Sequence, residues 1–194
     1  MMQLDFSPVR NGLISMNDFA AALSLDQLGA LTSASIDRML ALLETCTDAD
    51  VVFVPDDPAA NDDAAADPAD RGLAWTLGHN IVHATASGEE YAAVATELAR
   101  GVPFHGRPRY ETPWQSVTTV AQCRQRLEES RRIRLASLGM WPDVPHLDNG
   151  YVAWSTSGWV NAKGIFVWGL AHDADHERQM RGIIEQAQEV RLEA

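Results

Sequence analysis

The chain has 194 residues, a length that suits a single domain over residues 1–194 with a sizeable hydrophobic core. Its apolar runs fall well short of the roughly 20 residues that a bilayer span needs, and its start lacks the regions of a signal peptide, so we expect a soluble, cytoplasmic protein with no membrane partner. The net charge is −12, and the 15 basic residues are spread along the sequence, which argues against a nucleic-acid partner.

The first predicted long helix follows an arm formed by residues 1–23. Ser24 and Gln27 have the spacing of a capping box, and apolar residues then recur at helical spacing up to the stretch before Thr47. Residues 47–72 carry eight Asp and one Arg but lack the spacing of a calcium-binding loop. We therefore predict that this segment is a solvated acidic loop insertion without chemistry of its own.

Three further helices are predicted, over residues 73–100, 119–139 and 161–193. Thr119 and Gln122 form a second capping-box pattern, and glycines at 101 and 139 follow the helices that they are expected to end. The segment before the last helix is rich in Trp but shows no convincing strand periodicity. Four amphipathic helices predict an all-α fold, a four-helix bundle with long inter-helix loops.

Histidines stand four residues apart on two of these helices, His79 with His83 and His172 with His176. Side chains at this spacing leave the same face of a helix, so both rings of a pair can reach one ion. Six histidines placed at random would give only roughly 0.2 such pairs. The two pairs therefore predict a divalent metal site between the helices, although a single helical histidine is more often a hydrogen-bonded residue at the edge of a core.

The remaining residue types restrict the kind of site. The two cysteines, Cys46 and Cys123, form no C-x-x-C pair, so any metal must use nitrogen and oxygen ligands. His105 and His146 lie beside Gly or Pro in predicted loops, and we expect both on the surface. The spacing H-D-A-D-H differs from the H-E-x-x-H of zinc proteases, which disfavours protease chemistry.

Two motifs, WTLGHNIVH at residues 75–83 and HDADHERQ at residues 172–179, resemble those of the DinB-like or YfiT-like superfamily of metal-binding four-helix proteins. The resemblance covers most of the chain from about Leu25 onward. It implies a three-histidine metal site formed by His83, His172 and His176. His79 is not covered by the resemblance, and we rank a proton relay or a structural neighbour above a fourth ligand for it. The resemblance also implies a homodimer.

The superfamily includes bacillithiol-using thiol S-transferases, a mycothiol-dependent maleylpyruvate isomerase and a domain of ergothioneine-forming enzymes. Three neutral imidazoles leave an ion its full charge and an open position for a water or a thiol. Thiol transfer needs little beyond an activated thiolate, whereas hydrolysis also needs a general base, for which His79, Asp173 and Glu89 are candidates.

We therefore expect a metal-dependent S-transferase that acts on a small-molecule substrate and uses zinc or nickel together with a low-molecular-weight thiol. A metal-dependent hydrolase and a non-catalytic metal-binding or stress-associated module are the alternatives. A metal-free helical bundle that dimerises through an apolar face is a weaker third hypothesis.

Two aromatic-rich loops offer side chains that would recognise an anionic or polyhydroxylated thiol. Arg109 is the first candidate substrate-binding residue, and the others are Arg107, Tyr110, Trp114, Trp154 and Trp159. The ordinary alternative is that Arg109 pairs with Glu111 or another neighbour and that the Trp side chains close one end of the core.

Overall fold

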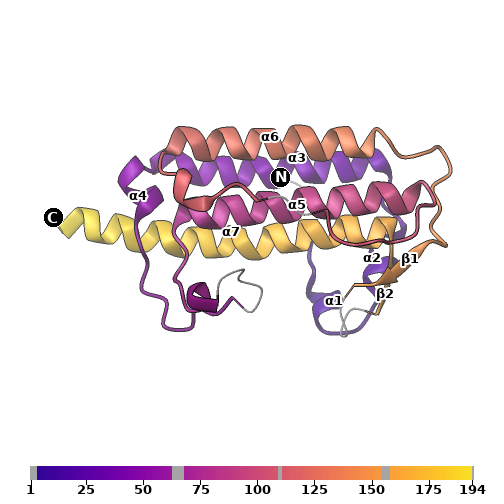
Figure 1. Ribbon diagram of the computed structural model, residues 1–194, viewed down its shortest axis with the longest axis horizontal. Helices are drawn as coiled ribbons and strands as arrows, with labels where there is room; N and C mark the ends of the chain where they lie inside the picture. The colour runs from indigo at the N-terminus through magenta and orange to yellow at the C-terminus, as the bar shows by residue number, and fades with distance from the viewer. Residues whose placement is uncertain (1–3, 63–67, 109–110, 154–157, 194) are drawn as a thin grey trace.

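The computed structural model describes residues 4–62, 68–108, 111–153 and 158–193, and most of them are helical. Four long helices lie side by side along the long axis of the molecule (Figure 1): α3 (Leu25–Leu42), α5 (Leu77–Ala99), α6 (Val120–Leu138) and α7 (Ala162–Glu193). Helix α5 packs most extensively against α7 and α6. The mainly helical chain agrees with the predicted all-α class.

The helix ends follow the capping signals in the sequence. Ser24 Oγ accepts from the backbone N–H of Gln27 at 3.2 Å, and Gln27 Oε1 accepts from the N–H of Ser24 at 2.8 Å, so the predicted capping box of α3 is confirmed. The box of Thr119 and Gln122 begins α6 in the same way. Helix α5 begins at Leu77, later than predicted, because the side chain of Thr76 caps its first turn.

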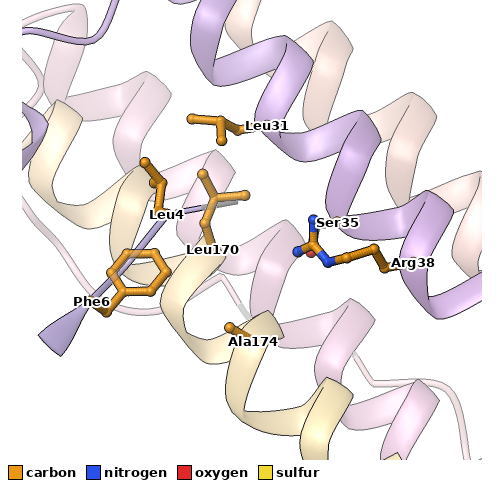
Figure 2. A pocket seen from close by; sticks show the side chains of 7 residues that line it. All are labelled: Leu4, Phe6, Leu31, Ser35, Arg38, Leu170 and Ala174. Atoms are coloured by element: carbon orange, nitrogen blue, oxygen red, sulfur yellow. The ribbon is translucent and has the colours of Figure 1, made fainter. Parts of the chain in front are cut away.

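The arm before α3 contains two short helices, α1 (Ser7–Arg10) and α2 (Met16–Ala21), which the sequence did not reveal. Phe6 and Met16 are buried against the core, so the arm is anchored there at these two points, while residues 11–15 between them are exposed. Leu4 and Phe6 cover a pocket of about 10 Å³ between α3 and α7 (Figure 2), which is at the lower limit of the space for one water. Its α7 residues are Leu170 and Ala174.

The acidic segment also begins with a packed element, α4 (Asp48–Val52). Asp50 is buried, and its Oδ2 accepts from Arg191 Nη1 of α7 at 2.5 Å. Asp48 Oδ1 accepts from the backbone N–H of Val120 at 2.8 Å, at the start of α6. The prediction of a solvated loop is therefore corrected for residues 48–52, where two Asp side chains tie the segment to the long helices.

A two-stranded antiparallel sheet of β1 (Gly150–Val152) and β2 (Trp159–Asn161) precedes α7, and it corrects the expectation that the Trp-rich segment contains no strand. Asn17 of α2 donates from Nδ2 to the carbonyl oxygen of Trp159 at 2.9 Å, and its Oδ1 accepts from the N–H of Asn161 at 3.0 Å. The hairpin and the arm therefore stabilise each other at the start of α7. The short helical turns η1 (Leu43–Thr45), η2 (Pro68–Asp70) and η3 (Trp114–Ser116) complete the described elements.

The hydrophobic core consists of two clusters separated by a layer of polar side chains. One cluster includes Tyr91 and Leu98 of α5 with Phe166 of α7, and the other includes Ile81 of α5 with Met180 of α7. We call the intervening level the polar layer; its buried members are Thr32, Ser35, Thr85, Ser87, Glu90, Ser130, Arg134, Asp173 and Glu177. Buried polar groups need partners, so this layer is where the fold specifies side-chain positions most strictly.

In the parts of the chain that the structure describes, no helix combines the length and the apolarity that crossing a bilayer would require.

Candidate metal centre

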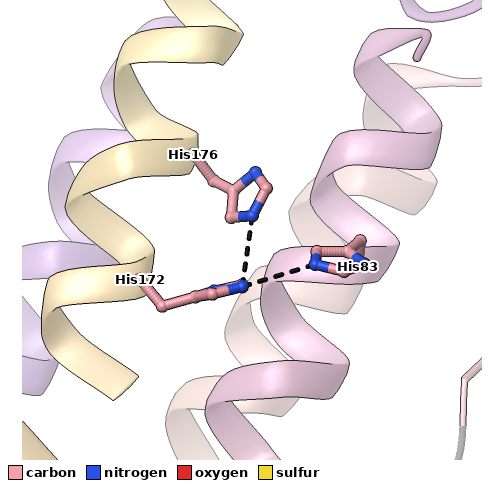
Figure 3. A group of neighbouring side chains, drawn as sticks. All are labelled: His83, His172 and His176. Atoms are coloured by element: carbon pink, nitrogen blue, oxygen red, sulfur yellow. Dashed lines mark hydrogen bonds between the residues drawn. The ribbon is translucent and has the colours of Figure 1, made fainter. Parts of the chain in front are cut away.

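Three histidines from two helices converge at the level of the polar layer. His83 lies on α5, and His172 and His176 lie one turn apart on α7. The Nε2 atom of His172 lies 3.3 Å from Nε2 of His83 and 3.2 Å from Nε2 of His176 (Figure 3). One ring nitrogen from each of the three lies within 4.8 Å of those of the other two, and each side chain is half-buried. The resemblance-based choice of these three residues is consistent with this geometry.

The spacing of the three rings fits a single transition-metal ion. Zinc–imidazole bonds of about 2.0–2.1 Å place two ligand nitrogens of a tetrahedral site about 3.3–3.4 Å apart. The separations of 3.2 and 3.3 Å at His172 agree with that distance. Among the residues that the structure describes, these histidines form the one group of three or more His, Cys, Asp or Glu side chains with ligand atoms this close. The donor set therefore suits a divalent ion that accepts nitrogen ligands.

Two polar side chains stand behind the ligand rings. Gln179 Oε1 lies 3.0 Å from Nδ1 of His176, and Glu111 Oε1 lies 3.8 Å from Nδ1 of His83. Side chains that face the far nitrogen of a ligating histidine orient the ring and tune its basicity. Neither side chain was predicted to face a histidine, although Gln179 follows His176 at a helical spacing of three, which is a usable signal.

His79 does not join the three-histidine group. Its ring stacks between Trp75, at a centroid distance of 4.5 Å, and Trp114, at 4.6 Å and an interplanar angle of 5°. Burial lowers its pKa to about 4, so the imidazole is neutral and weakly basic at neutral pH. His79 is thus a stacked neighbour of the site in this structure, and its assignment as a proton relay stays a prediction. His105 and His146 are exposed, as expected.

The tryptophans differ in their relation to the histidines. The indole of Trp75 is tilted against the ring of His83 at a centroid distance of 4.5 Å and is stacked on that of His176 at 5.8 Å, so it lies against two of the three rings. Trp114 reaches the site through His79. Trp159 lies on β2, where its indole packs over Gly150 of β1. The residue is 44% exposed, and it takes no part in the ring contacts described for Trp75. Of the predicted substrate-binding tryptophans that the structure describes, Trp114 and Trp159, Trp114 is therefore the one placed beside the site.

The predicted arginines fall in the segment between α5 and η3. Arg107 makes two hydrogen bonds to the buried Glu90, of 2.5 Å from Nε and 3.2 Å from Nη2, and this pairing raises the pKa of the guanidinium. The first candidate, Arg109, lies outside the described residues, as do Tyr110 and Trp154.

Two of the three general-base candidates are engaged in ion pairs. Asp173 Oδ2 lies 2.8 Å from Arg134 Nη1, and it also accepts from Ser35 Oγ at 3.2 Å. Glu89 pairs with Arg126 of α6. Since Asp173 is the residue next to His172 on α7, its side chain leaves the helix about 100° away from the ligand face. The carboxylate therefore belongs to the interior of the polar layer and not to the three-histidine group.

Comparison with known proteins agrees with the motifs in this geometry. A family model described as the DinB superfamily matches residues 31–180, a range that contains all three histidines. No curated protein and no solved structure matches the chain. Because the family model covers most of the chain, including α5, α6 and the part of α7 that carries the ligands, the chain belongs to the DinB superfamily.

Proposed function

We propose that this protein is a divalent-metal-dependent enzyme that holds zinc or nickel with His83, His172 and His176. The observation that carries this proposal is the convergence of three Nε2 atoms, with separations of 3.2 and 3.3 Å at His172, from helices that are distant in the sequence. A set of three neutral imidazoles leaves room for further ligands, in contrast to a closed structural site with four protein ligands. We also propose that the four long helices form the four-helix bundle of the family.

The reaction that we propose is transfer of a low-molecular-weight thiol to a small electrophile. A divalent ion at the three histidines supplies Lewis acidity, which lowers the pKa of a thiol or a water that reaches it. His83, His172 and His176 present neutral nitrogens, and the adjacent Trp75 excludes water from one side of the rings. Trp75 and Trp114 supply an aromatic wall for the substrate, while roles for Arg109 and Trp159 remain predictions.

Thiol transfer is favoured over hydrolysis because the candidate bases are engaged elsewhere. Asp173 is held by Arg134, and Glu89 is held by Arg126. His79 is stacked on both faces by tryptophan. Hydrolysis needs a positioned base to activate a water, whereas thiol transfer depends mainly on stabilising the thiolate. A metal-dependent hydrolase is the second candidate, and Glu111, whose Oε1 lies 3.8 Å from Nδ1 of His83, is a carboxylate that would serve it as a base.

The first experiment is elemental analysis of protein purified without an affinity tag or a chelator. We expect about one divalent ion per chain, and we expect its loss in His172→Ala. His105→Ala is the matched control, because it removes an exposed histidine that lies outside the group. Retention of metal by His172→Ala, or no uptake by the native chain after zinc or nickel is added, would remove the proposal.

The reaction class is tested on the metal-loaded protein. Titration with bacillithiol, mycothiol or glutathione should perturb the absorption of a nickel- or cobalt-substituted site if the thiol reaches the ion. Binding of a thiol, followed by its consumption with an electrophile such as a haloarene, supports the transferase. A loaded protein that binds no thiol but cleaves esters or amides would favour the hydrolase, and inertness toward both would favour a non-catalytic metal-binding module.

A further inference from the structure

A pair of amide side chains connects the two helices that carry the histidines. Asn80 of α5 donates from Nδ2 to Gln179 Oε1 of α7 at 2.6 Å. The same oxygen of Gln179 lies 3.0 Å from Nδ1 of His176. Asn80 is completely buried and lies one helical turn before His83, so the amide that holds Gln179 belongs to the helix that carries the opposite ligand.

The chemistry of this chain of contacts fixes where His176 carries its hydrogen. An amide oxygen accepts hydrogen bonds and cannot donate them, so the nitrogen that faces Gln179 Oε1 must be the N–H of the imidazole. A neutral imidazole has one N–H and one lone pair, and a hydrogen on Nδ1 therefore leaves the lone pair on Nε2. Nε2 is the atom that faces His172 at 3.2 Å, inside the three-histidine group.

We propose that Gln179, held by Asn80, is a positioning residue that keeps His176 in the tautomer that can bind a metal through Nε2. This inference rests on the proposed metal function and names the residues that prepare one ligand for it. In this structure Nδ2 of Asn80 and Nδ1 of His176 both face Gln179 Oε1, and the donation from Asn80 favours the orientation in which the oxygen of the Gln179 amide faces the ring. With the amide reversed, the Gln179 NH₂ group would face Nδ1, and the hydrogen of His176 would move to Nε2 and block coordination.

The pair also sets the distance between α5 and α7 at the site. Asn80 and Gln179 are side chains of moderate length, and a direct bond of 2.6 Å between them joins the two helices beside His176. Hydrogen bonds to the non-coordinating nitrogen of a ligand histidine hold its ring in place, and their loss usually weakens metal binding roughly 10- to 100-fold. Gln179 therefore acts on the ion through His176, without contacting it.

The test compares Gln179→Met with Gln179→Glu, and Gln188→Met is the matched control on the same helix. Met has a similar size but no acceptor, whereas Glu keeps an oxygen that accepts from both Nδ1 and Asn80. Two readouts are needed. One is the tautomer of His176 in metal-free protein at about pH 8, from ¹⁵N–¹H NMR of the histidine rings. The other is the dissociation constant for zinc or nickel, from competition with a chromophoric chelator.

We expect an Nδ1–H signal for His176 in the native protein, in Gln179→Glu and in Gln188→Met, with metal affinities within about threefold of one another. Gln179→Met should shift the signal toward Nε2–H and weaken the affinity roughly 10- to 100-fold. Thermal unfolding of each variant checks that the helices remain folded. If Gln179→Met unfolds, Gln179→Glu still decides the test, because loss of the His176 Nδ1–H signal in that variant would contradict the inference.

An Nε2–H signal in the native protein would overturn the proposal, as would unchanged metal affinity in a folded Gln179→Met. These outcomes differ from failure of the proposed function. If the native chain binds no ion, the metal function fails, while the NMR readout still decides whether Gln179 fixes the tautomer of His176.

Discussion

Arg134 of α6 and Asp173 of α7 form an ion pair with 2.8 Å between Nη1 and Oδ2, and only 1% of each side chain is exposed. The pair joins two helices in the polar layer at the residue next to His172. Gly88 of α5 lies against the guanidinium, since a Cβ atom there would stand 2.9 Å from Arg134 Nη1. The rotation of α7, and with it the direction of His172, is therefore coupled to a buried charge pair that lies about 100° around the helix from that histidine.

Removing one member of this pair should destabilise the protein strongly. We expect Arg134→Met and Asp173→Asn each to lower the free energy of unfolding by about 3–5 kcal/mol, because each leaves a buried polar partner without its counterpart. Urea unfolding of metal-free protein measures the change.

The matched control for that measurement is Arg132→Met, which removes an exposed pair with Glu129 and should leave the free energy of unfolding nearly unchanged. The double variant Arg134→Met with Asp173→Leu should be less destabilised than either single change. Equal effects of Arg132→Met and Arg134→Met would contradict the role assigned to the buried pair.

Metal binding should stabilise the folded chain, because the three histidines lie far apart in the unfolded one. At a free ion concentration about 100 times the dissociation constant, the gain is about 2.7 kcal/mol. Calorimetry with and without zinc or nickel measures it. His83→Ala should abolish the gain, and His146→Ala, an exposed histidine, should keep it. A metal-dependent shift that survives in His83→Ala would place the ion elsewhere.

Acid should destabilise the protein through His79. Its pKa is about 4 in the folded chain and about 6.5 when unfolded, so the unfolded state takes up the proton first as pH falls. The contribution of neutral His79 to the free energy of unfolding is therefore fully present above about pH 6.5. It is lost as the pH falls toward 4, and the loss amounts to at most roughly 3 kcal/mol. In metal-free protein, His79→Phe should keep the stack between the tryptophans and reduce this acid dependence. His105→Phe serves as the control, and an identical pH profile for His79→Phe would contradict the burial effect.

Trp75 should report metal binding by fluorescence, because its indole contacts the rings of His83 and His176. Nickel or copper at the three histidines would quench it by their proximity, as expected for open-shell ions. Among the six tryptophans of the chain, Trp75→Phe should remove most of the metal-dependent change. Trp159→Phe should leave the change in place, and equal losses in the two variants would show that Trp75 is not the reporter.

The long helices were predictable because their ends carry strong local signals. The boxes at Ser24 and Thr119 and the glycine after α5 act within one helical turn, so no tertiary information is needed to find them. Helix α4 and the strands β1 and β2 were missed because elements of three to five residues are too short for a periodic pattern to stand out. Their stability comes from contacts with distant residues such as Arg191 and Asn17.

The three histidines that the structure brings together were predicted from spacing and family resemblance, but their surroundings were not. His79 has the same spacing to His83 as His172 has to His176, and only the packing of Trp75 and Trp114 separates it from the ligands. Likewise, the partner of Asp173 lies on a different helix, and Asn80 meets Gln179 only when α5 and α7 pack. Contacts between helices depend on rotation and register, which local sequence does not encode.

The ligands come from α5 and α7 alone, with His83 and His172 separated by 89 positions. At ordinary rates of translation this interval lasts on the order of ten seconds. A nascent chain that has exposed α5 thus carries His83 without the two histidines of α7. The three histidines come together only after α7 has left the ribosome and packed against α5. An ion held by these histidines, as proposed above, would therefore be acquired only after α7 has been synthesised, and the newly made chain would begin without it.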